Sequence, residues 1–297
     1  MPRATVVTTG IELEYDTFGS PRDPALLLIM GFTAQLTSWP EDFCKKLADA
    51  GLFVIRFDNR DCGLSSKLDG VLVDIAPVMI AALADQPVPP VPYTLSDMAA
   101  DAVGLLDHLG IVRAHIMGAS MGGMIAQTVA IEHPSRCLSL VSVMSMPGEP
   151  EFGQPTPEAA AALLAPPPLD RAAYIAASSN WMTWQSKKHR DEDRTKTQAA
   201  ADYDRSFYPE GATRQLAAIY ASGRRTAALA ALQVPTLIIH GRDDTLITPS
   251  GGLRTAELID GANLLLLADM GHDLPEPLWP VVIDAVASHT SRSTTRP

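Results

Sequence analysis

The stretch Gly118-Ala119-Ser120-Met121-Gly122-Gly123 is the part of this chain that decides its fold. It lies between a strand-like run, Ala114–Met117, and a helix-like run, Met124–Glu132. A very tight turn from a strand into a helix needs small residues two positions before and after its central residue, because larger side chains would clash there. The pattern therefore predicts that Ser120 stands above a sheet, close to the positive N-terminal end of a helix. A glycine-rich turn with an incidental serine is the simpler alternative, and the flanking strand and helix argue against it.

Apolar runs and helical patterns alternate along the chain, which is typical of an α/β fold with a mostly parallel, twisted sheet. The expected strands are Ile11–Phe18, Ala25–Met30, Phe53–Asp58, Ala114–Gly118, Leu138–Ser145, Thr236–His240 and Asn263–Leu267. The expected helices are Pro40–Ala50, Leu95–Leu109, Met121–His133, Gly251–Ile259 and Pro280–Ser288. The short apolar runs of the later strands predict that these are buried on both faces of the sheet.

Two stretches interrupt this alternation. Residues 147–224 combine many prolines with alanine-rich helical patterns and aromatic residues, so we expect an inserted helical cap over the C-terminal edge of the sheet. Residues 66–92 form a long, lid-like connection around the apolar segment Ile75–Leu83, and connections of this length are usually functional or flexible. The predicted domains are therefore a core of residues 1–146 and 225–297, the cap 147–224 and the connection 66–92.

Composition narrows the partners that the protein can have. The formal net charge is −11 and the pI about 5.0, which argues against a nucleic-acid partner. The longest apolar runs have the length of strands, too short for a transmembrane segment, and the N-terminus is unlike a signal peptide. We expect a cytoplasmic monomer or homodimer. Peripheral contact of Ile75–Leu83 with a membrane stays open, but the segment has no basic face and burial against the cap is favoured.

A serine hydroxyl is a poor nucleophile until a base accepts its proton, and the base needs an acid that orients it. Of the seven histidines, His272 is the best candidate. It follows the last predicted strand in the loop Met270-Gly271-His272-Asp273, from which a base can reach the Ser120 turn. The other histidines fall within buried strands, at helical positions or in a charged block.

The acid is expected at the end of another strand, between nucleophile and base in chain order. The strand Thr236–His240 leads into two adjacent aspartates, Asp243 and Asp244. One of them can bond its own turn while the other orients His272. Glu149, which follows the preceding strand, is a further candidate.

The elbow and the order Ser120, Asp244, His272 resemble the α/β-hydrolase superfamily over nearly the whole chain. The segment Leu28-Ile29-Met30-Gly31-Phe32 resembles its His-Gly-x oxyanion segment. Residues 56–65, Arg-Phe-Asp-Asn-Arg-Asp-Cys-Gly-Leu-Ser, resemble its Asp-x-Arg-Gly-x-Gly-x-Ser loop. The closest subgroup is the actinobacterial esterases and lipases similar to aclacinomycin methylesterase. The family's Gly-x-x-Asp segment selects Asp244 over Asp243.

The resemblance implies an oxyanion hole formed by the backbone N–H groups of Phe32 and Met121. We also assign Gly31, Trp181 and Trp184 to substrate binding, with packing of the cap as the alternative for the two tryptophans. Two residues depart from the family pattern. Met30 replaces the usual histidine, and Asp61 replaces the usual glycine and is expected to add a carboxylate near the pocket mouth.

These residues predict a serine-dependent hydrolase of carboxylic esters, with a small-molecule, even lipid-like, substrate whose acyl or alkyl group is apolar. No metal or organic cofactor is expected, and the three widely spaced cysteines have no zinc-site spacing. A thioesterase, lactonase, C–C bond hydrolase or perhydrolase would use the same triad. A ligand receptor of this fold without catalysis is a further alternative. A serine at the elbow argues against dehalogenase or epoxide hydrolase chemistry, which uses a carboxylate nucleophile in related families.

Overall fold

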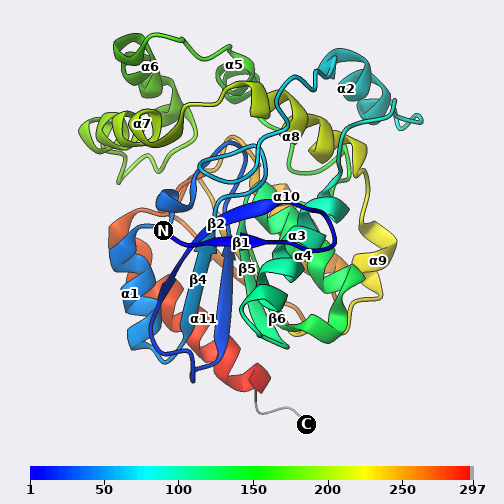
Figure 1. The fold of residues 1–297 in the computed structure, drawn as a ribbon, viewed down its shortest axis with the longest axis vertical. Coiled ribbons are helices and arrows are strands. Elements are labelled where there is room, and N and C mark those ends of the chain that lie inside the picture. Colours follow the sequence, from blue (N-terminus) through cyan, green and yellow to red (C-terminus); the bar gives the residue numbers. More distant parts are fainter. Residues whose placement is uncertain (295–297) are drawn as a thin grey trace.

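The computed structural model describes residues 1–294, and within them an eight-stranded sheet forms the centre of the molecule (Figure 1). The strand order is β1-β2-β4-β3-β5-β6-β7-β8, with β1, β2 and β4 antiparallel in pairs and the remaining neighbours parallel. The strands are β1 (Arg3–Thr5), β2 (Glu12–Phe18), β3 (Ala25–Ile29), β4 (Phe53–Phe57), β5 (Ala114–Ala119), β6 (Cys137–Val143), β7 (Thr236–Gly241) and β8 (Asn263–Leu267). The predicted α/β fold is confirmed.

Helices cover both faces of the sheet because successive strand residues point to opposite sides. On β3, Leu27 and Ile29 join a core with α3, α4, α9 and α10, whereas Leu26 and Leu28 join a second core with α1 and α11. The helices of the two layers are α1 (Glu41–Asp49), α3 (Leu95–His108), α4 (Met121–Glu132), α9 (Thr226–Ala230), α10 (Pro249–Leu258) and α11 (Trp279–Thr294). Short 3₁₀ helices are η1 (Leu36–Ser38), η2 (Pro134–Arg136), η3 (Ser178–Thr183) and η4 (Glu276–Leu278).

The edge strand β8 departs from the sequence prediction. Its side chains Leu264 and Leu266 are each 38% exposed, so this strand is not buried on both faces. An edge strand has a partner on one side alone, and here that partner is β7. The apolar pattern of Asn263–Leu267 could not distinguish an edge from a central strand.

The predicted helical cap is present above one end of the sheet (Figure 1). Its helices are α5 (Pro157–Leu164), α6 (Arg171–Ala177), α7 (Glu192–Ser206) and α8 (Glu210–Ala221). The cap is attached to the core by ion pairs with two buried aspartates: Arg205 Nη2 lies 2.8 Å from Asp58 Oδ2, and Arg214 binds Asp61. The boundaries 147–224 remain our interpretation of where the cap begins and ends.

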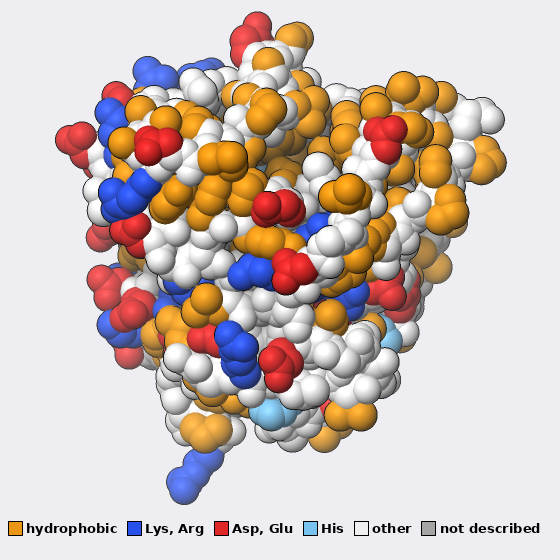
Figure 2. Space-filling model, turned by 45° about the horizontal axis from the view of Figure 1, so that its top comes forward, with side chains coloured by type: hydrophobic (Ala, Val, Ile, Leu, Met, Phe, Trp, Pro, Cys, Tyr) orange, Lys and Arg blue, Asp and Glu red, His pale blue; other side chains and the backbone are white. Residues whose placement is uncertain are grey.

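The apolar segment Ile75–Leu83 forms helix α2, which packs against α8. Asp74 begins the helix, since its Oδ1 accepts a hydrogen bond from Ala76 N at 3.2 Å. Val78 is buried, but Ile80 is 70% and Leu83 49% exposed. The segment is therefore buried against the cap on one side only, and the expectation of burial is wrong for the exposed side. Figure 2 shows apolar side chains gathered at the end of the molecule that carries the cap and α2. No helix within residues 1–294 has the length and hydropathy needed to span a membrane.

Candidate active site

Ser120 sits at a strained turn between β5 and α4. Its backbone has φ 57° and ψ −122°, a region that non-glycine residues rarely adopt. A Cβ atom on Gly118 would overlap with the carbonyl of Gly122, and one on Gly122 would overlap with the carbonyl of Ile29. The small residues predicted from the sequence are therefore required by the close approach of the turn to its own helix and to β3.

A histidine and an aspartate meet at the end of β7. His272 Nδ1 lies 2.7 Å from Asp244 Oδ2, and Asp244 Oδ1 accepts the N–H groups of Leu246 and Ile247 at 2.9 Å each. Burial alone would raise the pKa of Asp244, but the charge and hydrogen bond of His272, together with those of His240, outweigh burial and hold that pKa below its usual value. The carboxylate is thus ionised and fixed in orientation.

The loop that carries His272 is held by the cap. His272 N donates to Trp184 O at 2.6 Å, and Asp273 Oδ1 accepts from Ser186 N at 2.9 Å and Gly271 N at 3.1 Å. A Cβ atom on Gly271 would overlap with the backbone of Trp184 and Gln185. The glycine before His272 is needed because the cap backbone passes so close.

The three candidate acids have different partners. Asp244 contacts His272, whereas Asp243 accepts from Lys187 N at 3.3 Å and lies 3.4 Å from Lys187 Nζ. Glu149 is bound to Arg254 Nε at 2.7 Å and to Thr226 Oγ1 at 2.6 Å. The geometry therefore favours Asp244 as the partner of His272.

Ser120 and His272 are not joined by a hydrogen bond. In the part of the chain that the structure describes, Ser120 Oγ has no hydrogen-bond partner and His272 Nε2 has none either. Catalytic hydrogen bonds are often long before substrate binds, so this geometry is compatible with proton transfer between the two side chains.

Phe32 and Met121 present backbone N–H groups beside Ser120. Neither group donates a hydrogen bond to any of residues 1–294, and Met121 is the first residue of α4, where amides have no partner within the helix. Gly31 lies against the serine, since a Cβ on it would be 3.0 Å from Ser120 Cβ. The two amides could receive an oxyanion.

Two side chains that the sequence analysis did not single out fix this loop. Gln215 Oε1 on α8 accepts from Thr33 N at 2.8 Å, and Asn59 Nδ2 donates to Met30 O at 2.8 Å. Thr33 has φ 56°, so its strained backbone needs such support. Asn59 lies in the resembling loop 56–65, but no local pattern could have indicated that Gln215 contacts a residue so far away in sequence.

Asp61 is not at a pocket mouth, and that expectation is corrected. It is 2% exposed and accepts two hydrogen bonds from Arg214, at 2.7 Å from Nε and 2.8 Å from Nη2. Tyr93 OH and Leu68 N also donate to it, each at 2.8 Å. All of its acceptor capacity is used inside the protein, because α8 places Arg214 directly against it.

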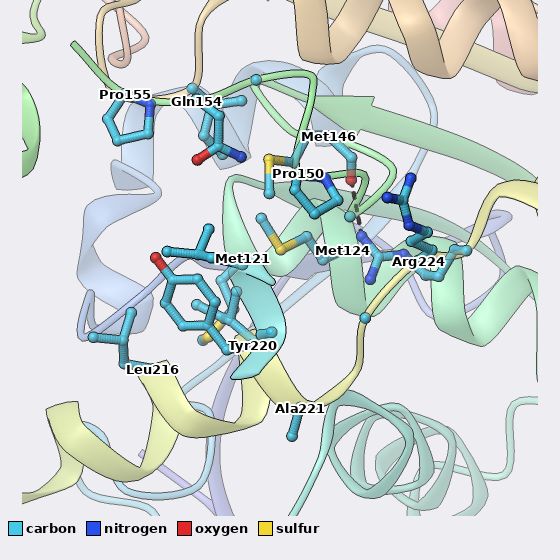
Figure 3. Close-up of a pocket in the computed structure, with 18 of the residues that line it drawn as sticks. Met121, Met124, Met146, Pro150, Gln154, Pro155, Leu216, Tyr220, Ala221 and Arg224 are labelled. Atoms are coloured by element: carbon cyan, nitrogen blue, oxygen red, sulfur yellow. Dashed lines mark hydrogen bonds between the residues drawn. The ribbon is translucent and has the colours of Figure 1, made fainter. Parts of the chain in front are cut away.

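A pocket of about 300 Å³ opens beside Ser120, and Phe32 and Met121 line it as well. Figure 3 shows apolar side chains converging on it from several elements. These include Met121, Met124, Met146, Pro150, Leu216 and Tyr220. The pocket is therefore mostly apolar.

The residues assigned to substrate binding do not line this pocket. Gly31, Trp181 and Trp184 are absent from its wall, as is His272. The Trp181 ring packs edge-on against Tyr174 at 5.9 Å between centroids, within an aromatic cluster of the cap, and Trp184 contributes its carbonyl to His272. These contacts favour the packing alternative for both tryptophans.

Comparisons with known proteins agree with this fold. Residues 24–276 match the family model described as alpha/beta hydrolase fold. The chain is 28% identical to the rhodomycin D methylesterases DauP of Streptomyces sp. strain C5 and DnrP of Streptomyces peucetius, in each case across 99% of this chain and 100% of the relative. The structure of the enol-lactonase from Burkholderia xenovorans LB400 is similar with a TM-score of 0.70 and 24% identity, covering 99% of this chain and 100% of that one.

Proposed function

The chain belongs to the α/β-hydrolase family, and we propose that it hydrolyses carboxylic esters with an apolar acyl or alkyl group through an acyl-enzyme on Ser120. The observation that carries the proposal is the 2.7 Å contact between His272 and Asp244, on the same edge of the sheet as the strained Ser120 turn. Two methylesterases among the relatives support ester hydrolysis over other reactions of the family.

In the proposed first step, His272 Nε2 accepts the proton of Ser120 Oγ as this oxygen attacks the ester carbonyl carbon. The negative charge that develops on the carbonyl oxygen is bound by the N–H groups of Phe32 and Met121. The bond to the alcohol then breaks, and the alcohol leaves with the proton from His272. The acyl group remains on Ser120.

In the second step, His272 takes a proton from water, and the resulting hydroxide attacks the acyl carbon. The proton returns to Ser120 Oγ as the carboxylic acid leaves. Asp244 acts throughout by accepting the hydrogen bond from His272 Nδ1, which fixes the tautomer and stabilises the imidazolium. Its lowered pKa keeps the carboxylate charged for this role.

The pocket supports an apolar substrate group. Its wall is dominated by methionine, leucine, isoleucine and proline side chains. A hydrocarbon group binds favourably to such a wall because binding removes apolar surface from water. A volume of about 300 Å³ fits a small organic group and no large polymer.

A rate profile over p-nitrophenyl esters of increasing acyl length tests this function. We expect turnover that rises with chain length until the pocket is full, and no turnover above background by the Ser120→Ala variant. The rates of hydrolysis of the methyl ester and of a thioester of the preferred acid are then compared, which separates an esterase from a thioesterase. Turnover that survives in Ser120→Ala would overturn the proposal.

A further inference from the structure

Arg225 is a buried cation in the wall of the same pocket as Ser120. It lies between α8 and α9 and is 8% exposed. The pocket that it lines is otherwise mostly apolar. Its position is thus unlike that of an arginine on the protein surface.

The guanidinium of Arg225 is bound by neutral oxygens alone. Nε donates to Gln127 Oε1 at 3.1 Å and Nη2 to Met146 O at 2.8 Å, and a dashed line at Met146 in Figure 3 marks the second bond. Nη1 has no partner among residues 1–294, and no carboxylate within this range pairs with the side chain. The Nη1 group of Arg225 can therefore donate to a ligand, and the positive charge of the side chain has no counter-charge among the described residues.

Neighbouring arginines on this side of the molecule show the contrast. Arg224 binds Glu151 through Nη1 and Nη2 at 2.9 and 2.8 Å, and Arg254 Nε binds Glu149 at 2.7 Å. Both are far more exposed than Arg225. Arg225 is the most buried of the three, so it would benefit most from a counter-charge, yet no carboxylate among the described residues pairs with it.

An unpaired buried charge is costly, because removal from water is not offset by an opposite charge. Burial lowers the pKa of Arg225 to about 10, which still leaves the guanidinium protonated at neutral pH. A ligand carboxylate could accept two parallel N–H groups from such a guanidinium and restore the balance of charge.

We propose that Arg225 binds an anionic oxygen group, a carboxylate in the first instance, at the far end of an otherwise apolar substrate. This inference rests on the proposed ester hydrolysis at Ser120. It makes the preferred substrate the ester of an apolar acid that carries a second, free carboxylate.

Helix α4 gives the approximate spacing between the two sites. Ser120 precedes the first residue of α4, and Gln127, which holds Arg225, follows Ser120 by seven residues. At 1.5 Å per residue, the two backbone positions are about 10 Å apart along the helix. The guanidinium also binds Met146 O, next to Ser145, whose Oγ donates to Ser120 O. We therefore expect the anionic group within roughly 10 Å of the carbonyl that Ser120 attacks, a distance that suits a medium-length dicarboxylic acid.

The test compares mono-p-nitrophenyl esters of adipic, suberic and sebacic acid with p-nitrophenyl hexanoate, octanoate and decanoate. In each pair the acyl chains have equal length and differ by one terminal carboxylate. We expect the wild-type protein to have the higher kcat/KM for the carboxylate ester of at least one pair. In Arg225→Met this preference falls by roughly tenfold to a hundredfold, the equivalent of one charge-assisted contact, while Arg225→Lys keeps part of it.

Arg224→Met is the matched control, because Arg224 also lines the pocket but is already paired. It should keep the preference for the carboxylate. A wild-type protein without this preference at any chain length would overturn the proposal, as would its loss in Arg224→Met with retention in Arg225→Met. The wild-type comparison needs no variant to fold.

Calorimetric titration with octanesulfonate separates this inference from the proposed function. The sulfonate carries an apolar tail and an anion but has no bond to hydrolyse. We expect it to bind Ser120→Ala and to lose at least tenfold in affinity when Arg225→Met is added. If the sulfonate binds but the wild type hydrolyses no ester, the proposed esterase function is contradicted and the anion site is supported. If esters are hydrolysed without sulfonate binding or a preference for the carboxylate, only the anion site is contradicted.

Discussion

Asp244 divides its two oxygens between His272 and the backbone: Oδ2 lies 2.7 Å from His272 Nδ1, while Oδ1 accepts Leu246 N and Ile247 N. The turn that follows β7 therefore fixes the carboxylate before it meets the histidine. The adjacent Asp243 points to Lys187 instead. Two neighbouring aspartates thus have separate roles, one toward the candidate base and one toward the surface of the cap.

The first prediction concerns this pair. Asp244→Asn should lower kcat by about a thousandfold to ten-thousandfold, because the amide cannot stabilise the imidazolium or hold the same tautomer. Asp243→Asn is the matched control and should stay within a few-fold of the wild type. Steady-state kinetics on p-nitrophenyl butyrate check both, and equal losses in the two variants would contradict the assignment of Asp244.

The second prediction concerns the oxyanion loop. Gln215→Leu removes the acceptor of Thr33 N, directly after Phe32, so the loop loses its support. We expect kcat to fall tenfold or more, toward the roughly hundredfold effect of losing one oxyanion donor. Gln233→Leu changes an exposed glutamine just before β7, at the opposite edge of the sheet, and should leave kcat almost unchanged. A fall in kcat that is equal in both variants would contradict a specific role of Gln215 in the loop.

The third prediction concerns the buried ion pair between cap and core. Arg214→Met leaves the Asp61 carboxylate buried without its cation, so the free energy of unfolding should fall by about 3–5 kcal/mol. Arg171→Met breaks an exposed pair with Asp204 and should have little effect. Urea unfolding measures both, and similar losses would mean that burial of the Asp61 pair is unimportant.

The fourth prediction concerns pH. Burial raises the pKa of Asp202 to about 6, although hydrogen bonds from Gln198 and Thr37 and the charge of Arg205 lower it, and the nearby Asp58 raises it further. The folded protein therefore binds this proton more tightly than the unfolded chain. Protonated Asp202 therefore adds to the free energy of unfolding at low pH. This contribution is lost as the pH rises from the usual pKa of an aspartate, 3.8, through about 6.

Asp202→Asn removes this loss because its amide stays neutral. The variant should gain stability relative to the wild type, by about 1 kcal/mol more at pH 8 than at pH 5. Asp204→Asn is the control, since hydrogen bonding to Arg171 lowers the pKa of Asp204 and the group is charged at both pH values. A difference that does not change with pH would contradict the prediction.

What could be predicted from the sequence was local. The Ser120 elbow depends on Gly118 and Gly122, which lie within the same turn, and the limits of α2 coincide with the apolar segment Ile75–Leu83. The likeness to a known family supplied the chain order of Ser120, Asp244 and His272. Each of these depends on neighbouring residues or on a recurring motif.

What could not be predicted depends on contacts between distant parts of the chain. Asp61 is neutralised by Arg214, and Thr33 is held by Gln215, both from a helix of the cap. The Trp181 ring packs against Tyr174 and does not line the pocket, because η3 packs against helices of the cap. No spacing in the sequence indicates which of two apolar surfaces an aromatic side chain will cover.

The most direct test of the account is labelling by a fluorophosphonate, followed by mass spectrometry of the intact protein and its peptides. The account predicts a single adduct on Ser120, no adduct in Ser120→Ala, and labelling at least about a hundredfold slower in His272→Ala, which has lost the base. A wild-type protein that stays unlabelled, or an adduct that persists in Ser120→Ala, would contradict the claim that Ser120 is the activated nucleophile.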